Sequence, residues 1–465
     1  MIMEKLEIKA DKYDFKEDID YKIRFPNGLS EKTIKNLSDI KGEPNWMREF
    51  RLNAYRFFSR RPMPSWIDGL DKLNLDDISY FALASEKKST SWDEVPQKIK
   101  DTYDKLGIPE AEKKALGGVE AMFDSTVVYN NVREELKKEG IIFCDTDSAV
   151  KDYPELVRKY FGKVVSPNDN KFAALNSALW SGGSFIYVPK GVKVKLPLQA
   201  YFRINAANMG QFERTLIIAD EGADVTYIEG CSATTYSKES LHAAVVEIIA
   251  MKGAHVKYIT IQNWSSDVYN LVTKRAFAYE NAYVEWIDAN IGAKLTAKYP
   301  SVYMLEPGAK ANILSIAFAD KDQHQDAGAK AIHLAPATSS VIRSKSICLN
   351  GGRTTYRGLV KIPRGSRDSS TSVTCDALIF DDHSRTDTYP YMEISEESAD
   401  VSHEASVGKI GEDQRLYMES RGIPENEGIN MIVLGFVGEF VKELPLEFAL
   451  EFNRLIKINM ENAVG

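Results

Sequence analysis

Alternating apolar and polar residues dominate the middle of the chain, from Gly183 to about His403. Runs such as 183–188 (GSFIYV), 215–219 (TLIIA), 245–250 (VVEIIA) and 256–261 (VKYITI) are rich in β-branched and aromatic side chains. Short runs of this kind, with a period of two, are typical of β-strands. No helical pattern separates them, so the pattern predicts a strand-rich central region.

A turn signature recurs between these runs. Its first position is occupied by Gly191, Gly222, Gly253, Asn281 and Gly308, which lie 31, 31, 28 and 27 residues apart. Glycine and asparagine tolerate a positive φ. A strand-rich repeat of about 30 residues is the sign of a solenoid. We therefore predict a mainly β protein with a parallel β-helix core. A β-sandwich is the alternative, but it does not explain the near-constant spacing.

Helical patterns flank this core. Residues 1–133 form a predicted N-terminal, mainly helical domain, with helices that begin near Ser30, Pro44 and Ser91. The core is assigned to residues 134–404, and residues 405–465 form a predicted C-terminal helical domain.

The C-terminal domain has a strongly apolar face, formed by Phe436, Phe440, Leu444, Phe448 and Phe452. This face predicts a cap that seals the open end of the solenoid, a docking surface for a partner, or both.

Composition narrows the function classes. The 465 residues are 44% hydrophobic and 27% charged, with a net charge of -8. No basic cluster suggests nucleic-acid binding. We see no signal peptide, and the longest apolar run, at 431–438, is too short to span a membrane. Four cysteines in so long a chain do not form a disulfide scaffold. We expect a cytoplasmic protein with free thiols.

One thiol stands out, at Cys231 in the segment 227–233 (YIEGCSA). Gly230 lacks a Cβ, so it lets another group approach the backbone closely. We expect Cys231 at a strand end, where the thiol can be reached. The alternative is a buried cysteine that only fills space, because reactivity requires an exposed, electropositive setting.

A second candidate lies towards the C-terminus. Cys348, Cys375 and His403 are separated by 27 and 28 residues. With that period, their side chains would stack as a ladder on adjacent coils and suit iron or an iron–sulfur cluster. Stacked small residues of an ordinary core are the alternative. Glu404 follows His403, and neighbours on a straight strand point to opposite faces, so both bind one cluster only where the strand bends or ends.

Longer motifs resemble a known family, the SufB/SufD family of iron–sulfur cluster assembly proteins. The resemblance covers most of the chain and favours the SufB branch. It rests on the segments 170–185 (NKFAALNSALWSGGSF), 198–205 (LQAYFRIN), 211–222 (QFERTLIIADEG), 227–233 (YIEGCSA), 241–247 (LHAAVVE), 262–264 (QNW), 356–362 (YRGLVKI), 403–406 (HEAS) and 409–414 (KIGEDQ).

The resemblance implies a right-handed β-helix and a scaffold without turnover of its own. It implies that Cys231 accepts persulfide sulfur from a cysteine desulfurase and its sulfur-transfer partner. Sulfur then passes along the interior, with Arg203 and Asn205 on its path, to a cluster region that matches Cys375, His403 and Glu404.

The implied partners are the ATPase SufC, docked on the C-terminal helices, and SufD or a second SufB copy. The resemblance further implies a transient cluster, taken as [4Fe-4S], apo iron–sulfur proteins as acceptors, and reduced flavin in the complex.

Two departures from the family pattern concern the ligand set. Some relatives carry a cysteine just before the motif 388–391 (TYPY), whereas this chain has the segment 381–387 (DDHSRTD) there. Some place an acidic residue before the His-Glu pair, where this chain has Ser402. Two other function classes stay open: a β-helix enzyme acting on carbohydrates and a purely structural interaction protein.

Overall fold

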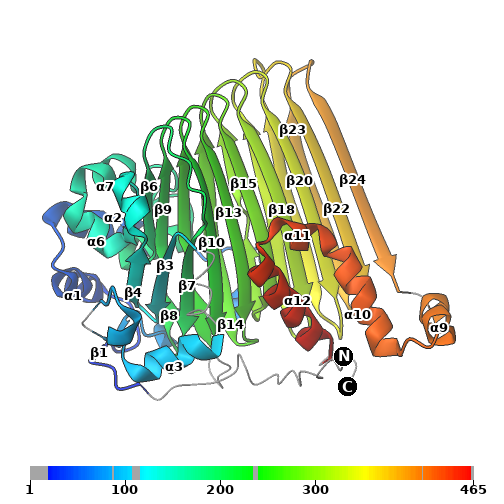
Figure 1. The fold of residues 1–465 in the computed structure, drawn as a ribbon, viewed down its shortest axis with the longest axis horizontal. Coiled ribbons are helices and arrows are strands. Elements are labelled where there is room, and N and C mark those ends of the chain that lie inside the picture. Colours follow the sequence, from blue (N-terminus) through cyan, green and yellow to red (C-terminus); the bar gives the residue numbers. More distant parts are fainter. Residues whose placement is uncertain (1–18, 86–87, 107–115, 234–238, 411, 462–465) are drawn as a thin grey trace.

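The computed structural model describes residues 19–85, 88–106, 116–233, 239–410 and 412–461. The strands wind into a parallel β-solenoid of about 8 turns, with helices towards both termini (Figure 1). The predicted fold class is therefore confirmed, and the β-sandwich alternative is wrong.

Two long sheets form the walls of the solenoid. The ten-stranded sheet contains β3 (Gly118–Phe123), β4 (Thr126–Val132), β7 (Leu198–Ile204), β10 (Asp224–Ala233), β13 (His255–Trp264), β15 (Tyr283–Gly292), β18 (Lys310–Ala319), β20 (Ser339–Cys348), β22 (Ser370–Ile379) and β24 (Asp400–Lys409). The twelve-stranded sheet contains β5 (Ile142–Asp145), β6 (Ser184–Val188), β8 (Gly210–Gln211), β9 (Arg214–Ala219), β11 (Ser240–His242), β12 (Val245–Ala250), β14 (Val268–Ala278), β16 (Leu295–Lys298), β17 (Ser301–Met304), β19 (His324–His333), β21 (Arg353–Ile362) and β23 (Arg385–Ile394).

The predicted turns stack on one another at one edge. Gly191, Gly222, Gly253, Asn281 and Gly308 all have a positive φ, between 54° and 75°. Each turn donates a backbone hydrogen bond to the next, as the Gly222 amide does to the Lys252 carbonyl at 2.8 Å. The repeat in the sequence thus reflects one left-handed position in each coil.

In-register stacking also builds the core. On the inner face of the ten-stranded sheet, Tyr227, Tyr258, Trp286, Ile313 and Ile342 occupy one level of successive strands. The ring centroids of the first three lie 5.1 and 5.0 Å apart. All five side chains are buried, so the interior is a packed core along this level.

The N-terminal region contributes both helices and strands. The helices are α1 (Glu31–Lys41), capped by the Ser30 hydroxyl, α2 (Asn45–Arg60) and α3 (Gln97–Leu106). The last begins later than predicted from Ser91, because Pro96 keeps Val95 extended. The strands β3 and β4 belong to the ten-stranded sheet, so the sheets begin before residue 134 and end after residue 404, at Lys409.

Four short helices lie between β4 and β6, among them α8 (Lys171–Leu179), which packs against α2 and the twelve-stranded sheet. The other three are α5 (Glu134–Lys138), α6 (Thr146–Asp152) and α7 (Pro154–Tyr160). The described residues of the N-terminal region also include a two-stranded ribbon, β1 (Ile23–Arg24) with β2 (Ala82–Leu83), and the short 3-10 turns Leu70–Lys72, Leu75–Asp77 and Trp92–Glu94.

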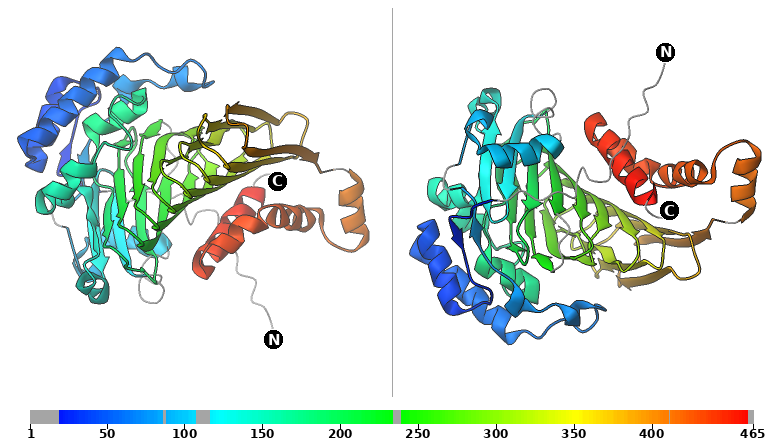
Figure 2. Two further views of the ribbon diagram at one scale, coloured as in Figure 1. Left: turned by 90° about the horizontal axis from the view of Figure 1, so that it is seen from above. Right: turned by 90° about the horizontal axis from the view of Figure 1, so that it is seen from below.

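The C-terminal helices do not cap the end of the solenoid. They are α9 (Glu412–Ser420), α10 (Glu425–Phe436), α11 (Gly438–Glu443) and α12 (Leu446–Glu461). Phe440 and Phe452 are buried with Ile259, Ile287 and Ile316, which point outward from the ten-stranded sheet. Figure 2 shows these helices beside the outer face of the sheet. The cap prediction is wrong because this face, and not the end, presents the apolar surface that needs cover.

Among the described helices, none has the length and apolar character that crossing a membrane requires.

A buried carboxyl group makes the stability of the fold depend on pH. Glu120 lies on the inner face of β3, where its Oε1 accepts a hydrogen bond from Ser184 Oγ (2.8 Å) and its Oε2 from Asn130 Nδ2 (3.1 Å). Burial raises the pKa of Glu120 from 4.5 to about 8. Between pH 4.5 and about 8, Glu120 is therefore protonated in the native state and ionised in the unfolded chain.

We predict that this group lowers the free energy of unfolding by about 1.4 kcal/mol for each pH unit between pH 4.5 and about 8. Glu120→Gln cannot ionise, so its stability should fall less over that range. Urea unfolding of both proteins at several pH values measures the difference. Parallel curves for the two proteins would contradict the prediction.

Candidate functional site

Cys231 lies inside the solenoid and not at an accessible strand end. It is the third residue from the end of β10 and is paired in register with Phe202 of β7 and Gln262 of β13. Only 2% of its surface is exposed. The prediction of a reachable thiol is therefore wrong, because two flanking strands enclose this part of β10 and its side chain faces inward.

Gly230, on the opposite face, has the predicted role. A Cβ at this position would lie 2.6 Å from the ring of Tyr201. The aromatic ring of β7 therefore rests directly on the backbone next to Cys231. The group that approaches closely is part of this chain.

A charged cluster surrounds the Cys231 thiol. Its Sγ contacts Glu229 Oε1 at 3.7 Å, and the Glu229 carboxylate lies 3.9 Å from Lys274 Nζ. Lys274 and Lys298 each place Nζ 3.4 Å from Asp288 Oδ1. Burial, followed by the charges of Glu229 and Glu213, raises the pKa of the thiol well above its usual range, while the two lysines oppose the shift. Cys231 is thus a thiol at rest.

The cluster is part of a longer chain of polar contacts through the interior. His242 Nε2 contacts Glu213 Oε1 at 2.5 Å, and its Nδ1 contacts Asn270 Oδ1 at 2.8 Å. Asn270 Nδ2 donates to Gln262 Oε1 (2.7 Å), which also accepts from Lys298 Nζ (3.4 Å). In order, the contacts join Glu213, His242, Asn270, Gln262, Lys298, Asp288, Lys274, Glu229 and Cys231.

A row of polar residues leads from this cluster towards the C-terminal end. Pairing in register places one residue of each strand on the level of Glu229. The row contains Glu229, Thr260, Asp288, Ser315, Ser344 and Cys375, from β10 to β22. All six side chains share the inward face, and all are buried except Ser344, which is half-buried. The two cysteines are therefore linked by small or charged side chains, next to the apolar level described above.

Arg203 and Asn205 lie near Cys231 but not beside its thiol. Arg203 Nη1 donates to Ser232 Oγ at 2.9 Å, and Ser232 faces away from the interior. Asn205 follows β7, and its backbone amide donates to Asp124 Oδ1 at 2.8 Å. Arg203 therefore lies on the outer face of the sheet, Asn205 lies just beyond the end of β7, and both side chains are buried.

The proposed ladder of Cys348, Cys375 and His403 is not formed. Cys375 pairs with Ser344 and Ala405, whereas Cys348 pairs with Ile379. The coils in this part of the chain repeat every 30 or 31 residues, so spacings of 27 and 28 do not keep three residues on one level. Cys348 shares the inward face with Ser344, and its Sγ contacts Thr354 Oγ1 of β21 at 3.0 Å instead.

Cys375, His403 and Glu404 nevertheless gather near the open end. Cys375 is 6% exposed, and burial, the main cause, raises its pKa to about 12. His403 pairs with Val373 and shares the inward face with Cys375, while Glu404 points to the other face. The strand neither bends nor ends between them. Within the described ranges, no three His, Cys, Asp or Glu side chains are grouped as a metal site.

Sequence reasoning missed Glu229, Lys274, Asp288 and Lys298. The available signal was a charged residue at an inward position of an otherwise apolar strand, as in Tyr227, Glu229 and Cys231, which alternate along β10. A charge on such a face requires a partner of opposite charge.

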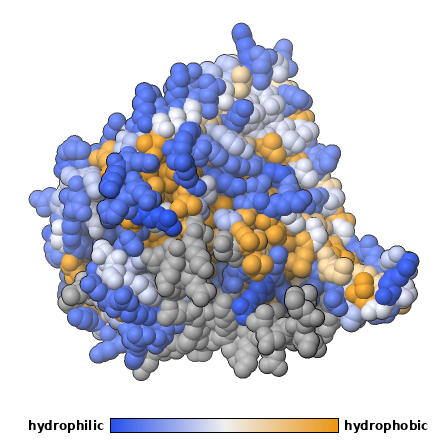
Figure 3. All heavy atoms as spheres, viewed as in Figure 1, coloured by the Kyte–Doolittle hydropathy of each residue, from blue (hydrophilic) through white to orange (hydrophobic). Residues whose placement is uncertain are grey.

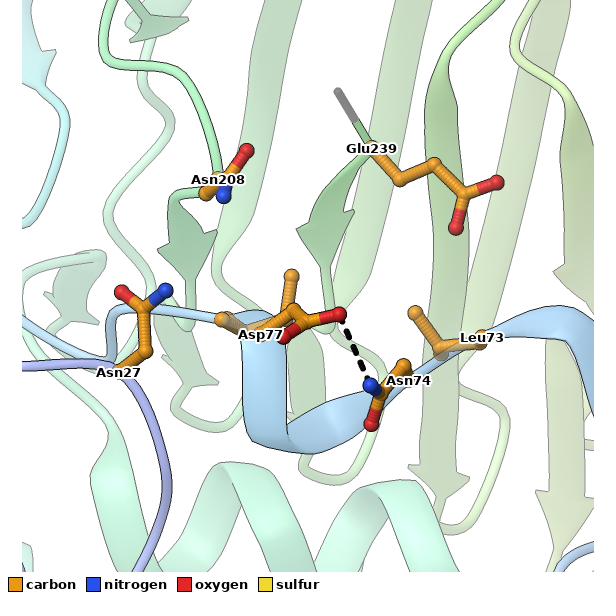
Figure 4. Close-up of a pocket in the computed structure, with 7 residues that line it drawn as sticks. Asn27, Leu73, Asn74, Asp77, Asn208 and Glu239 are labelled. Carbon is orange, nitrogen blue, oxygen red and sulfur yellow. Dashed lines mark hydrogen bonds between the residues drawn. The ribbon is translucent and has the colours of Figure 1, made fainter.

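A hollow of about 300 Å³ lies near the N-terminal part of the solenoid (Figure 4). Asn27, Asn74, Asp77, Asn208 and Glu239 line it, with Leu73 and Ile78. Glu239 is held by Lys294 and Tyr269. Its lining provides amides and carboxylates but neither a thiol nor an imidazole. It therefore lacks the groups that make Cys231, Cys375 and His403 candidates for sulfur or iron chemistry.

Comparison with known proteins agrees with this architecture. Residues 202–436 match the family described as "SUF system FeS cluster assembly, SufBD core domain", and residues 93–200 match "SufBD protein N-terminal region". Iron-sulfur cluster assembly SufBD family proteins of Staphylococcus aureus strains MRSA252 and USA300 are 57% identical over 98% of both chains. The corresponding protein of Staphylococcus haemolyticus is 56% identical over the same share. The chain therefore belongs to the SufBD family of iron–sulfur cluster assembly proteins.

Proposed function

We propose that the chain is a SufB-type scaffold of the cytoplasmic SUF system. It accepts persulfide sulfur at Cys231 from a cysteine desulfurase and its sulfur-transfer partner. It assembles a nascent [4Fe-4S] cluster and passes it to apo-proteins, while ATP hydrolysis belongs to the partner SufC. The chain itself has no enzymatic turnover in this scheme.

The polar row between Cys231 and Cys375 carries the proposal. Five strand steps separate β10 from β22, which corresponds to roughly 24 Å at about 4.8 Å per step. Sulfur therefore cannot pass directly between the two thiols and has to move as a small species. The short side chains of Ser315 and Ser344 occupy little space on that route.

Buried polar atoms without hydrogen-bond partners favour the binding of a small polar sulfur species along the row from Glu229 to Cys375. Gln262 Nε2, Asn290 Oδ1 and Asp288 Oδ2 are buried and have no hydrogen-bond partner among the described residues. Such groups are costly in a protein interior unless something binds to them. Their position beside the row fits a route for sulfur.

Arg203 and Asn205 take part in the proposal near the Cys231 end of β10. Both side chains are buried, and Arg203 is hydrogen-bonded to Ser232, the residue after Cys231. We therefore assign both residues to positioning the Cys231 end of β10 and not to direct contact with the passing sulfur.

The open C-terminal end is the proposed assembly site. Among the residues that the structure describes, strands β23 and β24 have no neighbour beyond them, and they expose Tyr389, Tyr391, Ile394 and Val407. Unpaired, apolar edges of this kind favour a partner strand. SufD or a second copy of this chain would continue both sheets. Cys375 and His403, which share the inward face, would then hold the cluster together with groups of that partner, and Glu404 on the opposite face of β24 would contact the partner beside it.

The C-terminal helices are the proposed docking surface for SufC. Met431, Leu446 and Leu450 are exposed, and the last two lie one helical turn apart on α12. Figure 3 shows apolar residues among polar ones over this part of the molecule. Reduced flavin would supply electrons to the complex, and we assign no residue of this chain to it.

We predict that Cys231→Ser abolishes sulfur acceptance, because serine cannot form a persulfide. Incubation with the desulfurase, its transfer partner and cysteine, followed by peptide mass measurement, detects the added sulfur. Cys144→Ser is the control, because Cys144 lies in the separate apolar cluster around Trp180. Sulfur retained on the Cys231→Ser protein at wild-type level would contradict the assignment.

We predict that Cys375→Ser lowers the amount of cluster formed by at least about half, because it removes a thiolate ligand that suits iron. Anaerobic reconstitution with iron and sulfide, read by visible absorbance, measures the effect. The Cys348→Ser protein should retain its cluster, because Cys348 lies on another level than Cys375 and contacts Thr354. Normal absorbance in the Cys375→Ser protein would refute the role of Cys375.

We predict that Leu446→Asp with Leu450→Asp weakens SufC binding at least about tenfold, which corresponds to ~1.4 kcal/mol. Leu334→Asp, an equally drastic change at an exposed residue outside the C-terminal helices, should bind normally. Titration with purified SufC gives the affinities, and native mass measurement of the complex shows whether it contains SufD or two copies. Equal affinities for all variants would place the SufC surface elsewhere.

A further inference from the structure

Glu229 is placed to receive the proton of Cys231. Its Oε1 is the acceptor of the thiol contact at 3.7 Å, and both residues point inward from β10. Glu229 itself is 1% exposed. Only 2% of the Cys231 surface is exposed, so the Glu229 carboxylate is the acceptor at hand for a proton that leaves Sγ.

Neighbouring donors fix the orientation of the Glu229 carboxylate. Tyr258 donates a very short hydrogen bond to Oε2, and Thr260 Oγ1 donates to Oε1 at 3.3 Å. Burial raises the pKa of Tyr258 well above its usual range, so this hydroxyl keeps its proton and remains a donor. Oε1 is thereby held towards the thiol.

The balance of charges around Cys231 indicates that the Glu229 carboxylate accepts a proton and does not only fill space. The ionisable groups that face the pair are Tyr227 of β10, Tyr258 of β13, Lys274 of β14, Asp288 of β15, Lys298 of β16 and Glu213, which precedes β9. Glu213 is engaged by His242. Glu229 and Asp288 offset Lys274 and Lys298, so a thiolate formed without a local proton acceptor adds an uncompensated charge to the interior.

We propose that Glu229 acts as the general base of Cys231 during sulfur acceptance, an inference that rests on the proposed function of this thiol. The proton moves from Sγ to Oε1, and the net charge of the cluster is unchanged. Sγ then attacks the outer sulfur of a persulfide donor.

The step balances without an oxidant or reductant. One S–S bond forms at Cys231 while the S–S bond of the donor breaks. The thiolate left on the donor takes up a proton, which Glu229 can return. The products are the donor thiol and a protonated persulfide on Cys231, and Glu229 is again a carboxylate that offsets Lys274.

The test compares the wild-type protein with Glu229→Gln, using cysteine persulfide as donor and peptide mass measurement at Cys231 over time. General-base catalysis typically contributes about 100-fold or more. At neutral pH, the rate of sulfur transfer to Cys231 should therefore be at least about tenfold lower in Glu229→Gln than in the wild type. The difference should narrow as the pH rises, because hydroxide then replaces the missing base. The wild-type rate should vary less with pH than that of the variant.

Glu120→Gln is the control, because this buried carboxyl group lies on the same inner face and does not contact Cys231. Its rate should equal that of the wild type. Thermal unfolding verifies that the variants are folded. Should Glu229→Gln fail to fold, Glu229→Asp serves in its place, since its shorter side chain withdraws the carboxylate from Sγ and should also slow the reaction.

The outcomes separate the two proposals. A wild-type protein that gains no sulfur at Cys231 overturns the proposed function and this inference together. Sulfur gained at Cys231 as fast, or faster, in the Glu229 variant, with the same pH dependence, overturns only the role of Glu229. A faster rate would show that the carboxylate acts on the thiol by repulsion alone.

Discussion

In-register stacking of parallel coils is the constraint on which the rest of the structure depends. Each strand lies directly beside its counterpart in the next coil, so a side chain on the inner face meets a neighbour on its own level. Apolar levels build the core in this way. A single charge cannot be accommodated, and Glu229 and Asp288 are buried together with Lys274 and Lys298 of the facing sheet. Polar and charged groups inside a solenoid are therefore arranged in rows, with one side chain from each successive strand.

The solenoid could be predicted because each coil needs one backbone position of positive φ. That requirement appears in the sequence as a periodic glycine or asparagine, from Gly191 to Gly308. Further along the chain the same period gave a wrong prediction, the ladder of Cys348, Cys375 and His403. Coils after β18 are a few residues longer, so Cys348 and Cys375 fell on different levels. The number of residues per coil in one part of a solenoid therefore does not predict which residues share a level in another part.

The orientation of single side chains was harder to predict. In β10 both alternating sets contain apolar residues, since Ile228 faces the C-terminal helices and Tyr227 faces the interior. The sequence therefore does not reveal that Cys231 is enclosed. The location of the C-terminal helices on the outer face of the sheet was hard to predict for the same reason. Their apolar face was evident, but its partner, a set of outward isoleucines in distant strands, becomes visible only when the coils are stacked.

The two ends of the solenoid differ, and this difference limits the size of the assembly. At the N-terminal end, the sheets finish with antiparallel strands, β4 against β3 and β5 against β6. The C-terminal end finishes with two parallel strands that lack neighbours among the described residues. A chain with two open ends would add partners head to tail and grow into a fibre. A chain with one open end of parallel strands takes one partner there, because the opposite end presents antiparallel strands, with α3 packed against β4, and does not repeat the same surface.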